Sequence, residues 1–222
     1  MVIEDLVRWA VQTRPRLAIL AAIRQPSTAS QLARVIDARQ GQCSRALSQL
    51  EARSLAFCLT PSVQRSRIFW LTSLGLSCQR TIRSRLFLPP LLHSFQELDW
   101  RLYSWVIYRH RSAILKAFQG PMTPSDIKRR AMSQSCELRI SGNNVRDILK
   151  LFIERGIVTR IPRRRRHRAQ FELTETGKQL QDLLWQAEIP LSCLPDLRTG
   201  GTSLPDPERL KGGEAASGRQ DG

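Results

Sequence analysis

The second half of the 222-residue chain repeats the pattern of its first half, and this internal repeat limits what the chain can fold into. Residues 19–32 (ILAAIRQPSTASQL) match residues 114–127 (ILKAFQGPMTPSDI) at an offset of 95. Two later blocks match at an offset of 102, LSQLEARSL with LKLFIERGI and LTSLG with LTETG. The larger second offset indicates an insertion in the second copy, within residues 131–142. The chain is therefore expected to contain the same structural unit twice.

The pattern within each copy predicts three helices, a β-hairpin and a last helix. Apolar residues recur every three or four positions in the first and third helices, and a residue that favours helix N-caps, Thr28 or Thr123, precedes the second. Two short apolar stretches separated by a polar loop indicate the hairpin. The predicted ranges, first copy and then second, are about 14–24 and 96–118 for the first helix, 42–53 and 143–155 for the third helix, 55–59 with 68–72 and 157–161 with 170–174 for the hairpin strands, and the segment after L-T-x-x-G for the last helix.

The part of the chain that is expected to fold is strongly basic. Lys and Arg number 35 against 19 Asp and Glu, a net charge of +16, and thirty of the basic residues are arginines. Residues 189–222 are nearly neutral, with four basic and five acidic side chains, and their Pro, Gly and Ser content predicts a disordered tail. Because so high a charge opposes a compact chain unless a polyanion binds it, a nucleic acid is favoured as the partner.

Several function classes lack the motifs that they need. The five cysteines are odd in number and form no C-x-x-C pair, so neither a disulfide framework nor a zinc site is expected, and a reducing cytoplasm fits. The longest apolar run, residues 17–23, is too short to span a membrane. The sequence contains no glycine-rich phosphate loop, HExxH, GxSxG or paired-carboxylate motif. We therefore expect no enzyme, no metal site and no cofactor.

The joint spacing of the Leu-rich third helix, the E-R-G-I or A-R-S-L segment, the hairpin and L-T-x-x-G resembles the winged helix-turn-helix domains of MarR-like and PadR-like transcription regulators. The resemblance covers about residues 14–85 and 96–187. It implies a mainly α fold with small β-hairpin wings (α+β), built as two tandem winged helix-turn-helix domains, 1–88 and 89–188. Two departures are visible, because Ser54 replaces the usual glycine after the third helix and the second copy carries the insertion. Each subunit of those families has one such domain and dimerises, so this chain is expected to act as a monomeric pseudo-dimer or as a homodimer.

The resemblance also implies which residues contact DNA. The third helix of a winged helix enters the major groove, and the hairpin tip touches the backbone or the minor groove. An apolar stripe of each third helix is expected to face inward: Cys43, Ala46, Leu47 and Leu50 in the first copy, and Val145, Ile148, Leu149 and Phe152 in the second. The candidate DNA contacts are the remaining polar side chains and the hairpin tips: Gln42, Ser44, Arg45, Ser48, Gln49, Arg65 and Arg67, then Asn143, Asn144, Arg146, Lys150, Arg163, Arg164, Arg165, Arg166, His167 and Arg168.

The second hairpin tip is the most strongly charged of these segments. Residues 163–168 hold five arginines, which repel one another unless phosphate groups lie between them. Arg160, at the adjoining strand edge, is expected to contribute to the same contact. Because each engaged cation releases about one counterion, the affinity for DNA should fall steeply with salt.

The leading hypothesis is a transcription regulator that binds double-stranded DNA sequence-specifically, in the cytoplasm at the nucleoid and without a membrane partner. Because the two third helices carry different side chains, the DNA site should be asymmetric. Two alternatives stay open, a replication initiator of plasmid or viral type and a tandem winged-helix scaffold for protein interactions in a chromosome or transcription complex. The scaffold needs no arginine-rich hairpin, so the basic charge counts against it.

Overall fold

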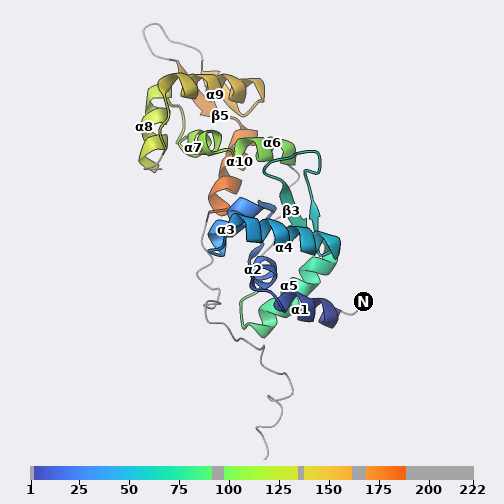
Figure 1. The fold of residues 1–222 in the computed structure, drawn as a ribbon. Helices are drawn as coiled ribbons and strands as arrows, with labels where there is room; N and C mark the ends of the chain where they lie inside the picture. The colour runs from blue at the N-terminus through green and yellow to red at the C-terminus, as the bar shows by residue number, and fades with distance from the viewer. Residues whose placement is uncertain (1–2, 92–97, 135–137, 162–168, 189–222) are drawn as a thin grey trace, which may run out of the picture.

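The computed structural model describes residues 3–91, 98–134, 138–161 and 169–188, which form helices and small antiparallel sheets (Figure 1). The first copy of the repeat consists of α1 (Ile3–Val11), α2 (Arg14–Ala22), β1 (Ser27–Thr28), α3 (Ala29–Val35), α4 (Gln40–Ala52), β2 (Ala56–Cys58), β3 (Ile68–Leu71) and α5 (Ser73–Arg85). The second copy consists of α6 (Trp100–Val106), α7 (Arg109–Lys116), α8 (Pro124–Gln134), α9 (Gly142–Glu154), β4 (Val158–Ile161), β5 (Gln170–Leu173) and α10 (Glu175–Gln186).

Both predicted hairpins are confirmed. In the first, β2 pairs antiparallel with β3, and Ala56 lies opposite Leu71. In the second, β4 pairs antiparallel with β5, and Val158 lies opposite Leu173. The sequence pattern did not predict that a third segment joins each hairpin. The short strand β1 pairs with β3 in the first copy, and a single bridge from Met122 to Phe171 takes its place in the second.

Buried apolar side chains divide into one cluster within α1–α5 and another within α6–α10. The predicted apolar stripes of α4 and α9 are buried in these clusters, as expected. Ile68 of β3 is the exception to the division, because it packs in the second cluster. All four residues of β3 are consequently buried, although a hairpin strand normally leaves one face in water. The second copy therefore covers the first hairpin at Ile68, while Phe57 of β2 stays exposed.

The predicted long helix over about 96–118 is wrong. Within the part of this range that is described, α6 ends before Ile107, and Tyr108 has the extended ψ of 136° from which α7 begins. The first copy has the same arrangement, because α1 precedes the predicted helix α2. Each copy therefore begins with two short helices. The predicted insertion lies partly in α8, which has 11 residues against 7 in α3.

The L-T-x-x-G segment joins the last helix of each copy to the end of the third helix. Thr72 caps α5 by accepting the N–H of Gly75, and its hydroxyl donates to the carbonyl of Ser54 at 2.6 Å. Thr174 caps α10 in the same way, accepting from Gly177 and donating to the carbonyl of Gly156. A Cβ on either glycine would overlap a backbone carbonyl oxygen, that of Leu55 or that of Ile157. Only glycine allows the two segments to pack this closely.

A glutamine one turn further along each last helix makes a second equivalent link. Gln79 Nε2 donates to the carbonyls of Leu20 and Ile23, at the end of α2, at 2.7 and 2.6 Å. Gln181 Nε2 donates to the carbonyls of Leu115 and Phe118, at the end of α7, at 2.9 and 3.0 Å. Carbonyls at a helix end lack the full set of partners inside the helix, so each glutamine adds hydrogen bonds at the end of a helix.

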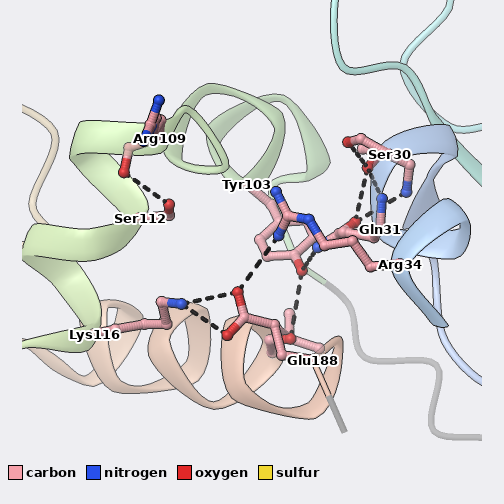
Figure 2. A network of polar contacts seen from close by, with 10 residues as sticks. Ser30, Gln31, Arg34, Tyr103, Arg109, Ser112, Lys116 and Glu188 are labelled. Carbon is pink, nitrogen blue, oxygen red and sulfur yellow. Dashed lines mark hydrogen bonds and ion pairs between the residues drawn. The ribbon is translucent and has the colours of Figure 1, made fainter. Parts of the chain in front are cut away.

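A buried polar network joins the two copies (Figure 2). Gln31 of α3 donates from Nε2 to the hydroxyl of Tyr103 at 3.0 Å, and that hydroxyl lies 3.4 Å from the carbonyl of Leu183. Gln25 donates to the same carbonyl at 3.2 Å. Nearer the surface, Glu188 bridges Lys116 at 2.8 Å and Arg34 at 3.6 Å. A buried polar group that is left without its hydrogen-bond partner destabilises the folded state. This network therefore favours the one arrangement of the two copies in which every bond is made.

The close approach at Gly177 predicts a stability loss. Gly177→Ala should lower the free energy of unfolding by about 1–3 kcal/mol, because the added methyl group forces the Ile157 carbonyl away from α10. Gly41→Ala is the matched control, since nothing lies within 4 Å of its Cβ position, and it should be neutral or stabilising by less than about 1 kcal/mol. Urea unfolding measures both, and equal effects would contradict the close packing.

The buried network predicts a pH dependence. Burial raises the pKa of Tyr103 to about 12, although the hydrogen bond from Gln31 opposes part of the rise. The unfolded tyrosine loses its proton near pH 10 while the folded one keeps it, so Tyr103 should remove about 1 kcal/mol of stability between pH 9 and pH 11. We expect urea unfolding to show that Tyr103→Phe lacks this part of the fall and that Tyr108→Phe retains it. A wild-type fall shared by both variants would show that Tyr103 is not responsible.

Candidate nucleic-acid interface

The third helix of the first copy, α4, has the predicted division between an apolar and a polar face. Its apolar stripe is buried, and Cys43 within it is fully buried, so burial raises the pKa of that thiol. A buried thiol of raised pKa is a poor nucleophile, which agrees with a structural cysteine. The five predicted contact residues of this helix are all exposed: Gln42, Ser44, Arg45, Ser48 and Gln49.

The third helix of the second copy, α9, agrees with the prediction except at Asn144. Asn143, Arg146 and Lys150 are exposed, and Arg146 donates to Oδ1 of Asn143 at 3.0 Å. Asn144 is half-buried, and its side-chain nitrogen lies 3.1 Å from Nδ1 of His110 on α7. Asn144 was expected to face outward, but this side chain in the first turn of α9, which follows the N-cap Ser141, lies against α7.

A groove of about 660 Å³ lies between α9, the second hairpin and the start of α8. We call it the second groove. Arg146 and Lys150 line it from α9, and Arg160 lines it from β4. Phe171, Leu149 and Ile153 supply its apolar wall, and Thr123 and Ser125 lie at its α8 end. Three cations thus gather on one concave surface.

The first copy has a groove at the corresponding place, with a volume of about 420 Å³. This first groove lies between α4, the first hairpin and the start of α3. The repeat offsets relate most of its residues to those of the second groove: Thr28 to Thr123, Ser30 to Ser125, Ser44 to Arg146, Ser48 to Lys150, Arg67 to Ala169 and Phe69 to Phe171. The position of the groove is therefore a property of the repeated unit, whereas its charge differs between the copies.

The hairpin supplies the cation of the first groove. Arg65, on the loop between β2 and β3, is exposed and lines the groove beside Tyr108 of the second copy. The predicted contact Arg67 is held by its own copy, because its Nε donates to Sγ of Cys58 at 3.4 Å and it lies 3.6 Å from the Glu51 carboxylate. The hydrogen bond to Cys58 raises the pKa of Arg67. Arg67 nevertheless lines the first groove, so its contact with DNA stays a prediction, while its guanidinium also links β2 and α4 to the hairpin.

Some of the predicted contacts cannot be placed. Arg163, Arg164, Arg165, Arg166, His167 and Arg168 lie outside the described residues, so the second hairpin tip stays a prediction. The described strands that lead to this tip, β4 and β5, end at Ile161 and begin at Gln170, beside the second groove. Sequence reasoning did not identify Ser30 and Ser125 as groove residues, although their match at the offset of 95 carried that signal.

No protein-family model matches the chain, so the resemblance to MarR-like and PadR-like regulators stays a prediction. No curated protein matches the chain either. Among solved structures, the chain is similar to ScpB from Mycobacterium tuberculosis, with 16% sequence identity and a TM-score of 0.19, over 82% of this chain and 97% of that chain. A likeness this distant carries no argument about function.

The two grooves can bind an anion but offer no metal chemistry in the described ranges. Their charged groups are guanidinium and ammonium groups, which donate hydrogen bonds to phosphate oxygens. Among the residues that the structure describes, no group of three or more His, Cys, Asp or Glu side chains could hold a metal ion. In the same residues, every helix is too short or too polar to cross a bilayer.

Proposed function

We propose that the chain is a sequence-specific double-stranded DNA-binding protein whose two copies, 1–88 and 89–188, are tandem winged-helix domains and that it regulates transcription. The observation that carries the proposal is the second groove, where Arg146, Lys150 and Arg160 converge between the third helix and the hairpin. A helix that presents arginine and amide side chains beside such a groove suits a DNA major groove, because arginine pairs with guanine and amides pair with adenine. The chain acts in this proposal by binding and not by catalysis.

The two third helices would read different sequences. In the first copy the outward side chains are amides, serines and one arginine, whereas in the second copy Arg146 and Lys150 occupy the positions of Ser44 and Ser48. The second copy therefore contributes more to phosphate and guanine binding, and the first more to adenine contacts. The preferred DNA site is expected to be asymmetric, with two different halves.

The second groove predicts a loss of DNA binding on charge removal. Arg146→Ala/Lys150→Ala should lower affinity for a selected duplex roughly 10- to 100-fold and reduce the salt slope by about two, since each lost phosphate contact releases about one counterion fewer. Arg80→Ala/Lys178→Ala removes the same charge from exposed positions on the two last helices, α5 and α10, which line neither groove. Anisotropy titrations at several salt concentrations compare the two double variants.

The control decides how the result is interpreted. Lys150 and Lys178 are matched, because each is exposed and pairs with an acidic side chain three residues earlier, at 3.8 and 3.6 Å. If both double variants lose affinity equally, net charge alone explains the binding and the groove has no special part. If the wild-type protein binds no duplex at low salt, the proposal of DNA binding is wrong and a protein-interaction scaffold is favoured.

The arginine-rich loop supplies a separate prediction from the sequence. Replacing Arg163, Arg164, Arg165 and Arg166 with Ala should weaken binding to all duplexes by a similar factor, because backbone contacts carry no base preference. The sequence preference, measured by selection from a random duplex library, should stay the same. A changed preference would show that this loop reads bases, and an unchanged affinity would remove the loop from the interface.

A further inference from the structure

A third concave surface, of about 490 Å³, lies where the first hairpin meets α6 of the second copy. We call it the seam cleft. Three arginines line it: Arg65 of the hairpin loop, Arg101 of α6, and Arg155, the C-cap residue of α9. The rings of Trp105 and Tyr108 also line it. A hydrogen bond of 3.0 Å from Ser104 Oγ to the carbonyl of Ser66 links the hairpin to α6 here.

The cations of the seam cleft have no acidic partner in the described ranges. No carboxylate there lies within 4.0 Å of the guanidinium of Arg65, Arg101 or Arg155. Asp99 also lines the cleft, but its Oδ1 caps α6 by accepting the N–H groups of Arg101 and Leu102 at 2.9 and 3.1 Å. Among the described residues, these three arginines therefore form no ion pair, and Asp99 is the carboxylate that lines the cleft with them.

A fourth guanidinium raises this charge further. The Cζ atoms of Arg111 and Arg155 lie 4.0 and 4.2 Å from the ring centroid of Trp105. Burial and the charge of Arg155 both lower the pKa of Arg111. Cation–π attraction holds the two like charges at one ring, and an anion in the cleft would offset their mutual repulsion.

The first copy provides an internal comparison. Arg16 and Arg53 lie 4.0 and 4.5 Å from the ring centroid of Trp9, and they correspond to Arg111 and Arg155 at the offsets of 95 and 102. Two arginines on one tryptophan are therefore part of the repeated unit. What distinguishes the second copy is the addition of Arg65 and Arg101 to form a concave surface.

We propose that the seam cleft binds phosphate groups of the DNA backbone and joins the two grooves into one continuous contact. This inference rests on the proposed function. Arg65 and Tyr108 line both the seam cleft and the first groove, and Arg155 directly follows α9, which lines the second groove. In this proposal, a DNA backbone that contacts both third helices also contacts the cleft. Guanidinium forks bind phosphate oxygens in pairs, which suits the three arginines that reach the cleft.

The test compares Arg101→Ala/Arg155→Ala with Arg8→Ala/Arg53→Ala in the full chain. Arg53 and Arg155 occupy the same C-cap position, and each lies over a tryptophan, so the variants differ mainly in the seam cleft. Two probes are used, a mixed-sequence duplex of 30 base pairs and tripolyphosphate. For the duplex, we expect the cleft variant to bind at least about 10-fold more weakly and to reduce the salt slope by about two, while the control retains the wild-type slope.

A duplex that binds the wild type and the cleft variant with equal salt slopes overturns the seam cleft and leaves the proposed function standing. The wild-type protein could instead bind tripolyphosphate and no duplex, with the cleft variant losing the tripolyphosphate. That result would place a free phosphate compound in the cleft and refute the proposed function. If neither probe distinguishes the cleft variant from its control, the inference is wrong. Two further variants guard against misfolding. Arg101→Lys/Arg155→Lys keeps the charge and should restore the wild-type salt slope. The single change Arg65→Ala, at an exposed position, should lower the salt slope by about one.

Discussion

The packing of each last helix against the end of the third helix determines where every other part of a copy can lie. In both copies a threonine caps the last helix and donates to the carbonyl of Ser54 or Gly156, while a glycine three residues later touches the next carbonyl. The third helix must end at that point and the hairpin must start there. The groove between helix and hairpin follows from this one close contact, which explains why it recurs at equivalent positions in both copies.

The contact between the copies restricts the movement of the first hairpin. Ile68 packs in the second core, and Ser66 accepts a hydrogen bond from Ser104, so the first hairpin cannot move freely toward a ligand. The second hairpin has no such partner among the described residues, and its loop carries the run of arginines. One hairpin of the pair thus helps to orient the two copies, whereas the described part of the other hairpin packs within its own copy. A fused chain can divide these tasks because its two copies need not be identical.

Much of the fold could be predicted from the sequence, because burial periodicity and turn residues are local signals. The stripes of α4 and α9, both hairpins and the cap at Thr28 follow from such signals. Ser54 has a φ of 55° where Gly156 has 68°, so the helix end survived the loss of the glycine that normally marks it. The break at Tyr108 was missed because neither proline nor glycine marks it in residues 98–118. The sequence did not show the intramolecular partners of Arg67 and Asn144, because Cys58, Glu51 and His110 come from other elements that no periodicity reveals.

The charge of the two grooves shows how the copies diverged around a shared frame. Ser44 and Ser48 leave the helical wall of the first groove uncharged, where the second groove has Arg146 and Lys150. The first groove instead receives Arg65 from its hairpin and Tyr108 from the other copy, so it is complete only when the two copies are packed together. A ligand that needs both grooves must therefore recognise the assembled pair and cannot be bound fully by either copy alone. The buried hydrogen bonds of Tyr103 hold the two copies together and thereby keep the binding surface assembled. They affect the free energy of binding in this way although Tyr103 lines neither groove.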